Sequence, residues 1–214
     1  MTICAATNNG GKLKELRRIL AAMGHEVKSL RELGITLDPE ETGETFAENA
    51  RLKALAFCAA AGLPTVADDS GLCVDALNGA PGVFSARYCG HHGDDAANNR
   101  KLLAEMRDVP AENRAARFVS AVCFALPGDA PRTLTVLGEC PGSIAFGETG
   151  DNGFGYDPLF VPDRVGLPDG TSVPNAARRS YAELADGEKD AISHRGRALE
   201  RLAAELPSFL NDSM

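Results

Sequence analysis

Several common signals are missing from this chain of 214 residues, and each absence argues against a class of protein. Its 6 cysteines include no C-x-x-C pair, so no zinc site is expected; those within apolar runs are expected to be buried free thiols of a reducing compartment. No apolar run approaches the roughly 20 residues of a membrane-spanning helix, and no signal peptide is recognisable. The net charge of -8 disfavours binders of nucleic acid or anionic membranes, which need a basic face. We therefore expect a cytoplasmic protein with no nucleic acid and no membrane as partners.

Well-known nucleotide-binding and hydrolase signatures are missing as well. Neither the G-x-x-x-x-G-K-[ST] loop nor the dinucleotide-binding G-x-G-x-x-G pattern occurs. No G-x-S-x-G elbow is found, so an acyl-enzyme hydrolase is not expected. The pair His91-His92 has no partners at metal-ligand spacing and is expected to lie in a surface loop. Any phosphate-binding or hydrolytic site must therefore use other elements.

The apolar pattern predicts an α/β fold with a mixed sheet. Apolar residues make up 44% of the chain, which is enough for a sizeable core. Strands and helices alternate early, whereas the two later strands are joined by a short Pro-Gly-Asp turn typical of an antiparallel pair. Strands are expected at 2–6, 26–30, up to 68, 117–126 and 133–140, and helices at 13–23, 45–61 (with a Thr45/Glu48 capping box), 94–106 and 193–206. Residues 163–179 are predicted to be a polar, mobile excursion.

The most informative stretch is Ala67-Asp68-Asp69-Ser70-Gly71-Leu72, where two adjacent carboxylates follow an apolar run and precede a turn-forming Ser-Gly. Adjacent carboxylates repel each other, and a divalent cation is the usual partner that makes them tolerable. Taken alone, the stretch is equally a good solvated turn. The rest of the chain favours a functional acid pair.

Positive charge occurs at the start of two predicted helices. Lys12 follows the loop Asn9-Gly10-Gly11, and His194-Arg195 follow the N-cap Ser193. Cations in a first helical turn oppose the helix dipole, whereas the free N–H groups there bind phosphate oxygens. A bound polyanion would explain both places. For the glycine loop alone, a phosphate site and a plain solvated turn are equally compatible.

Two further segments could contribute to a site. The acidic loop 38–44 becomes interesting if the fold brings Glu40 near Asp69, because carboxylates from two elements can hold Mg²⁺. The segment 152–158 places Phe154 and Tyr156 among glycines beside Asp157, which suits a flat ligand stacked on an aromatic ring. The simpler alternatives are a solvated charge run for the first and core-anchoring aromatics for the second.

Together these segments resemble the inosine triphosphate pyrophosphatase family, and they occur in that family's order over almost the whole chain. The matching blocks are Thr7-x-Asn9-x-x-Lys12, Glu41-Thr42-Gly43-x-Thr45-Phe46-x-Glu48-Asn49-Ala50-x-x-Lys53-Ala54, the stretch 67–72, Pro81-Gly82-Val83-Phe84-Ser85-Ala86-Arg87-Tyr88, Gly153-Phe154-Gly155-Tyr156-Asp157-Pro158 and Ser193-His194-Arg195. Any one block is a weak signal, whereas the ordered set is highly specific.

The resemblance implies a single two-lobed domain over 1–214, with a long mixed β-sheet flanked by helices and a central active-site cleft. It also implies a homodimer that depends on Mg²⁺. The implied reaction converts ITP, dITP or XTP and water to the nucleoside monophosphate and pyrophosphate.

The resemblance also implies a role for each matching residue. Asp69 would be the base that activates water, and Glu40 with Asp69 would bind Mg²⁺. The phosphates would be held by Thr7, Asn8, Asn9, Gly10, Gly11 and Lys12, while Lys53 and Ser70 would touch phosphate or metal-bound water. The purine would stack on Phe154, be surrounded by Gly155, Tyr156 and Asp157, and be read at its 6-keto oxygen by Lys189, His194 and Arg195.

The chain departs from the family pattern at two places, and two alternative functions are compatible with the motifs. The connection 163–179 is longer than the family's usual one, and Phe84 stands where the family often has Tyr. A hydrolase of standard or pyrimidine nucleotides would differ in the base pocket. A nucleotide-binding regulatory module without turnover would not need Asp68, Asp69 and Glu40 together.

Overall fold

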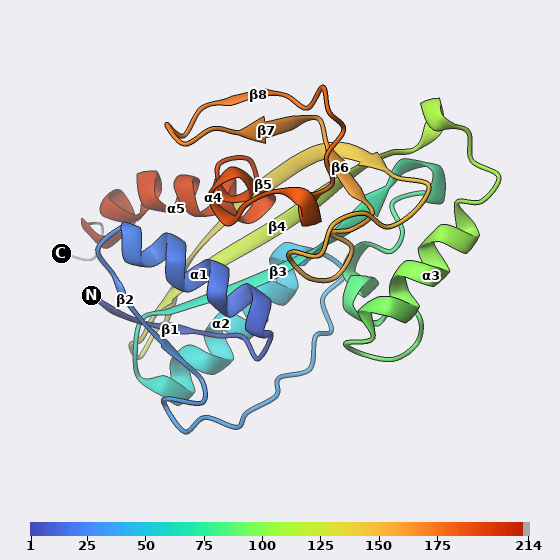
Figure 1. Ribbon diagram of the computed structural model, residues 1–214. Coiled ribbons are helices and arrows are strands. Elements are labelled where there is room, and N and C mark those ends of the chain that lie inside the picture. Colours follow the sequence, from blue (N-terminus) through green and yellow to red (C-terminus); the bar gives the residue numbers. More distant parts are fainter. Residues whose placement is uncertain (212–214) are drawn as a thin grey trace. The chain divides into compact units, whose positions relative to one another are not determined.

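The computed structural model describes residues 1–211, which form an α/β protein (Figure 1). Its strands are β1 (Thr2–Ala5), β2 (Glu26–Ser29), β3 (Thr65–Val74), β4 (Ala115–Leu126), β5 (Arg132–Ile144), β6 (Phe160–Pro162), β7 (Arg164–Gly166) and β8 (Ser172–Pro174). Its α-helices are α1 (Gly10–Ala22), α2 (Phe46–Ala61), α3 (Asp95–Glu105), α4 (Asp186–Asp190) and α5 (His194–Asn211). Within residues 1–211, no helix combines the length and apolar character needed to cross a membrane.

The main sheet is mixed, as the sequence predicts. It has six strands in the order β2-β1-β3-β4-β5-β6. Strand β1 runs parallel to β2, with Thr2 opposite Glu26, and parallel to β3, with Cys4 opposite Thr65. Strand β5 runs antiparallel to β6, with Gly142 opposite Pro162. The presence of parallel and antiparallel pairs in one sheet confirms the expected mixed α/β architecture.

The chain divides into two compact units. The first contains residues 1–69, 120–138 and 195–211, and the second contains residues 70–119 and 139–194. Strands β3, β4 and β5 each begin in one unit and end in the other. Asp69 is the last residue of the first unit before β3 continues into the second.

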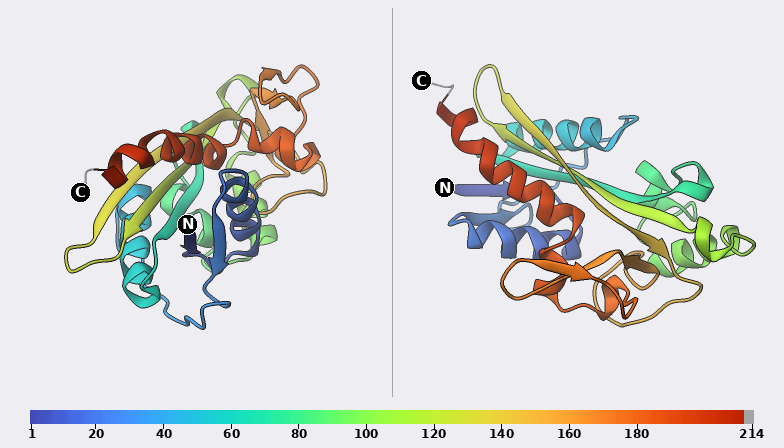
Figure 2. Two further views of the ribbon diagram at one scale, coloured as in Figure 1. Left: turned by 90° about the vertical axis from the view of Figure 1, so that its left-hand side faces the viewer. Right: turned by 90° about the horizontal axis from the view of Figure 1, so that it is seen from above.

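The first unit places helices on both faces of its strands (Figure 2). Successive strand residues point to opposite faces, so each strand contributes to two cores. One core joins α1 and α5 to the strands through Ile3, Ala5, Leu16, Leu20, Val66, Val122, Phe124, Leu199 and Leu202; the other joins α2 through Cys4, Ala6, Ala50, Ala54, Phe57, Ala67, Ala121 and Cys123. This packing holds the starts of α1 and α5 and the Asp68-Asp69 pair in fixed places.

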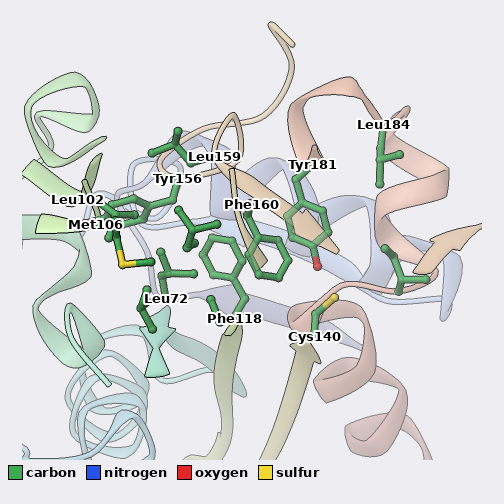
Figure 3. Packing of buried hydrophobic residues seen from close by; sticks show 14 of the residues in the cluster. Leu72, Leu102, Met106, Phe118, Cys140, Tyr156, Leu159, Phe160, Tyr181 and Leu184 are labelled. Atoms are coloured by element: carbon green, nitrogen blue, oxygen red, sulfur yellow. The ribbon is translucent and has the colours of Figure 1, made fainter. Parts of the chain in front are cut away.

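The second unit is built around three aromatic rings (Figure 3). The ring of Phe118 lies 4.8 Å from that of Phe160 and 5.7 Å from that of Tyr181, and Phe160 and Tyr181 are 4.9 Å apart. Such edge and stacked contacts stabilise the core beyond what the burial of the apolar ring surface contributes. Leu102 and Met106 tie the end of α3 to the same core.

The chain after Asp69 differs from the sequence prediction. A strand ending at residue 68 with a Ser-Gly turn was expected, but β3 continues through Ser70 and Gly71 to Val74. The residues from Gly71 to Val74 are buried. Strand context therefore overrides the local turn preference of Ser-Gly. The carboxylates lie in the middle of a strand and not at its end.

Two other elements also differ from prediction. The segment 163–179 contains an antiparallel hairpin that was not predicted, in which Val165 of β7 pairs with Val173 of β8. Helix α5 continues past Pro207 to Asn211. Proline removes one helical hydrogen bond, but Phe209 and Leu210 pack against the core and Arg132 donates to the Phe209 carbonyl oxygen at 2.9 Å. Tertiary contacts therefore hold the last turn.

Candidate active site

The first candidate group lies at the start of α1. Asn9 is the N-cap, and its Oδ1 accepts a hydrogen bond from the Lys12 N–H at 2.9 Å. The Thr7 Oγ1 accepts from the Asn9 N–H at 3.1 Å, while Asn8 and Gly10 are exposed. An exposed helix N-terminus with a glycine in its first turn is suited to binding an anion.

Asp68 is the buried centre of an ion network. Its carboxylate lies 2.9 Å from the Lys12 Nζ and 3.1 Å from an Arg195 guanidinium nitrogen, and the Ser120 hydroxyl donates to it. Arg195, which is equally buried, also pairs with Glu15. Two of the three cations expected to face a polyanion therefore already have protein carboxylates as partners.

The network fixes the ionisation of its members. Burial alone would raise the pKa of Asp68, but Arg195 and Lys12 outweigh this effect and hold that pKa well below its usual range. Burial alone would lower the pKa of Arg195, but Asp68 and Glu15 outweigh it and raise that pKa. Both groups therefore remain charged at neutral pH.

Asp69 has a different environment from its neighbour. Its Oδ1 accepts from the Lys53 Nζ at 2.9 Å, and the same Nζ donates to Glu41 at 3.0 Å. Its Oδ2 is buried and has no hydrogen-bond partner among residues 1–211. Burial raises the pKa of Asp69, and the charges of Lys53 and Lys12 offset this only in part.

The two adjacent carboxylates therefore differ in proton affinity. Asp68 is held ionised by two cations, whereas the pKa of Asp69 is raised by burial. Carboxyl pairs whose environments push their pKa values apart are typical of acid–base sites. Asp69 is the member suited to accept a proton.

The acidic loop brings a different glutamate to this place from the one expected. Glu40 is exposed. Glu41 shares the Lys53 ammonium with Asp69. The loop is fastened by the Asn49 Oδ1, which accepts from the Gly43 N–H at 2.8 Å.

The side chains around Asp69 were compared with the ligands that a metal ion needs. Within residues 1–211, no three His, Cys, Asp or Glu side chains gather into a group that could hold a metal ion. The buried, unpartnered Oδ2 of Asp69 is nevertheless the kind of hard oxygen that Mg²⁺ takes as a ligand. Carboxylates of the acidic loop and phosphate oxygens have the same donor chemistry, so the residues present fit Mg²⁺.

The second candidate group belongs to the second unit. The Asp157 Oδ2 accepts from the Phe154 N–H at 2.9 Å and from the Lys189 Nζ at 2.8 Å. Gly153 has φ +80°, and a Cβ there would overlap the Asp157 carboxylate. This position therefore requires glycine. The loop is folded around a buried carboxylate.

The remaining predicted base-reading residues lie close to aromatic rings. The Lys189 Nζ is 5.1 Å from the Phe154 ring centroid and 5.2 Å from that of Tyr181. The buried His194 ring stacks on Phe118 with 4.8 Å between centroids. The Tyr156 hydroxyl donates to the Ser85 carbonyl oxygen at 2.9 Å. The structure thus brings Phe154, Asp157 and Lys189 together.

Several residues of these two groups were not predicted from the sequence as site residues. Glu15 and Ser120 complete the Asp68 network, Glu41 completes the Lys53 contacts, and Asp95 contacts the Phe154 loop. Two of them carried a signal: Glu15 lies beside the apolar stripe of its helix, and Ser120 interrupts an apolar strand. A buried polar residue usually has a partner.

Comparison with known proteins identifies the family of this chain. The sequence model described as the Ham1 family matches residues 3–205. A dITP/XTP pyrophosphatase of Exiguobacterium sibiricum is 47% identical over 99% of this chain and 100% of its own length. One of Nocardia farcinica is 51% identical, over 97% of this chain and 95% of its own.

Solved structures show the same similarity. The Staphylococcus aureus Ham1 protein superposes with a TM-score of 0.77 at 39% identity, covering 97% of this chain and 99% of its own. The nucleoside-triphosphatase, or dITP/XTP pyrophosphatase, of Mycobacterium abscessus superposes with a TM-score of 0.70 at 48% identity, covering 94% and 98%.

Proposed function

Because the chain belongs to the Ham1 family, we propose that it hydrolyses dITP, ITP and XTP to the nucleoside monophosphate and pyrophosphate. Relatives named dITP/XTP pyrophosphatase, alignable over nearly their whole length, support the substrate class. The observation that carries the chemistry is the buried Asp68-Asp69 pair, in which Asp68 is paired with Lys12 and Arg195 while the Asp69 Oδ2 has no hydrogen-bond partner among residues 1–211.

The proposed base is Asp69. Its raised pKa suits it to take a proton from the attacking water. Lys53, on its other oxygen, fixes the direction of the carboxylate. Asp68 is too well stabilised as an anion to accept that proton, and it serves to hold Lys12 and Arg195.

We propose Glu40 and Asp69 as ligands of Mg²⁺. When bound, the ion would supply positive charge for the phosphate oxygens and lower the pKa of a coordinated water. The exposed position of Glu40 leaves its carboxylate accessible to such an ion. Lys53 and Glu41 would keep the Asp69 carboxylate in place beside it.

The phosphates are proposed to bind to the glycine loop and its neighbours. Free N–H groups and Lys12 at the start of α1 are suited to the charge that phosphoryl transfer develops. The full proposed set is Thr7, Asn8, Asn9, Gly10, Gly11, Lys12, Lys53 and Ser70. Lys12 is partly exposed, with 16% of its side chain accessible, so it can serve a phosphate while its pair with Asp68 persists.

The base is proposed to stack on Phe154, with Gly155, Tyr156 and Asp157 around it and with Lys189 and His194 reading its 6-keto oxygen. Donors aimed at a keto oxygen would reject adenine, whose 6-amino group also donates, at a cost of about 1–3 kcal/mol per unpaired group. Arg195 was predicted to share this role. Its burial against Asp68 and Glu15 favours a role in holding Asp68.

Hydrolysis assays with resolved products test this function. We expect Mg²⁺-dependent release of pyrophosphate from dITP and XTP, and far slower turnover of dATP, dGTP and dCTP. Release of inorganic phosphate with a nucleoside diphosphate would contradict the proposed point of attack. Binding of dITP without turnover would favour a regulatory module instead.

The assembly and place of action are also proposals. We propose a homodimer, supported by the exposure of Phe84 and Phe146, whose relative accessibilities of 57% and 68% are large for phenylalanine. Sedimentation velocity at several concentrations measures this state directly. We also propose the cytoplasm as the location.

A further inference from the structure

We propose that Asp95 and Asn99 of α3 are positioning residues that fix the backbone of the base-binding loop at Gly155. This inference rests on the proposed role of the segment Phe154–Asp157 in binding the purine. Both residues lie outside the family motifs that the sequence analysis used, and about 60 positions separate them from the loop in the chain.

The geometry is a clamp on both sides of one glycine. The Gly155 N–H donates to the Asp95 Oδ2 at 2.8 Å, and the Gly155 carbonyl oxygen accepts from the Asn99 Nδ2 at 3.2 Å. These two groups belong to the two peptides that flank the Gly155 Cα, so the pair of bonds fixes both of its backbone dihedrals. Gly155 has φ +62°, a conformation that favours glycine, and lies in a turn that the Asp157 N–H closes by donating to the Phe154 carbonyl oxygen at 3.2 Å.

The clamp acts on the residues that would hold the base. Gly155 connects Phe154, the proposed stacking ring, to Tyr156, whose hydroxyl is tied to Ser85. A rotation at Gly155 would turn the Phe154 ring away from Lys189, which now lies over it. Binding residues are effective when a second layer of contacts holds their geometry.

The burial of Asn99 favours this role over simple packing. The residue is 4% exposed, and its Oδ1 has no hydrogen-bond partner among residues 1–211. A buried amide with an unpaired oxygen is unfavourable, and an apolar residue at the same place would avoid that cost. The hydrogen bond from Asn99 to the Gly155 carbonyl oxygen is the interaction that offsets this cost.

Helix α3, which carries both clamp residues, is held in place at both of its ends. Asp94 caps it by accepting from the Ala97 N–H at 2.9 Å, and Leu102 and Met106 anchor its other end in the core. Asp95 lies in the first turn, where a carboxylate is favoured by the helix dipole. The two clamp residues are one helical turn apart and therefore lie on the same face.

The chain provides a matched control in Asn98. It is adjacent to Asn99, equally buried at 2% exposure, and its Oδ1 accepts from the Cys89 N–H at 2.8 Å instead of contacting the loop. The test compares Asp95→Ala, Asn99→Ala and Asn98→Ala by hydrogen–deuterium exchange of the peptide 152–157 and by dITP kinetics. Asp95 is exposed, so its variant folds even if Asn99→Ala does not.

We expect faster exchange at 152–157 in Asp95→Ala and Asn99→Ala but not in Asn98→Ala. We expect the KM for dITP to rise about tenfold with a much smaller change in kcat, since one hydrogen bond of loop order is lost. Asp95→Asn, which keeps an acceptor, should restore the wild-type KM. These results together support the clamp.

Other results overturn it. If exchange at 152–157 is unchanged in Asp95→Ala, or if Asn98→Ala has the same effect, the clamp does not exist. If exchange changes while the KM for dITP stays at its wild-type value in an active enzyme, the clamp does not position the base. A wild-type enzyme inactive on dITP contradicts the proposed function instead, and the exchange data then decide the clamp separately.

Discussion

Replacing Asp68 with asparagine should destabilise the protein strongly. The change keeps the volume but removes the carboxylate that lies 2.9 Å from the Lys12 ammonium and 3.1 Å from the Arg195 guanidinium. The side chain of Arg195 is 1% exposed, so water cannot replace the lost carboxylate, and Glu15 is left to balance the guanidinium. Removing one partner of a buried ion pair costs about 3–5 kcal/mol.

The assay is equilibrium unfolding in urea at pH 7, monitored by far-UV circular dichroism, which measures the free energy of unfolding directly. In a thermal scan of a protein of this size, a loss of about 3–5 kcal/mol corresponds to a fall in Tm of roughly 6–20 °C. Lys12→Met is the matched control: Lys12 is partly exposed, so its removal leaves the buried Asp68–Arg195 pair intact and should cost far less.

The pH dependence of this difference follows from the depressed pKa of Asp68. A carboxylate with a lowered folded-state pKa stabilises the protein above its unfolded pKa, about 3.9, and loses that contribution as pH falls toward the folded value. The gap in unfolding free energy between wild type and Asp68→Asn should therefore be constant above about pH 5 and shrink in stronger acid. A gap below about 1 kcal/mol at pH 7, or one that widens in acid, would refute the reasoning.

Three further changes test other parts of the site. Asp69→Asn should lower kcat for dITP by about 10²–10⁴-fold, the usual contribution of a general base, while calorimetry still detects nucleotide binding; surviving turnover would show that Asp69 is not the base. Gly153→Ala should raise the KM for dITP, because φ is +80° and the new methyl group would overlap Asp157; an unchanged KM would show that the loop accommodates it. Arg179→Ala removes hydrogen bonds of 2.8 and 3.2 Å to Glu188 beside Lys189 and should cost about 1 kcal/mol in thermal unfolding; a neutral result would make this pair irrelevant to stability.

Local patterns predicted much of this molecule. The mixed α/β sheet, the Thr45/Glu48 capping box of α2 and the helix start at the glycine loop are all present. Each depends on short-range rules: apolar periodicity, capping chemistry and glycine conformation. The resemblance to the inosine triphosphate pyrophosphatase family, which rested on ordered motifs, is confirmed by the family match and the relatives.

Predictions that rested on isolated local preferences were less successful. Ser70-Gly71 reads as a turn, but β3 continues through it because strand context and burial stabilise the extended backbone there. Pro207 reads as a helix end, but core contacts carry α5 past it. In both places long-range packing outweighs a preference of about 1–3 kcal/mol.

The sequence by itself determined that two adjacent aspartates, a glycine loop and several cations are present, together with the family they belong to. Only the tertiary structure decided how charge is shared: Arg195 and Lys12 neutralise Asp68, while Lys53 links Asp69 to Glu41. These pairs join residues separated by up to 127 positions, and electrostatic energy depends on distance and burial, which no local pattern contains. The different ionisation of two neighbours in one strand is therefore a property of the fold.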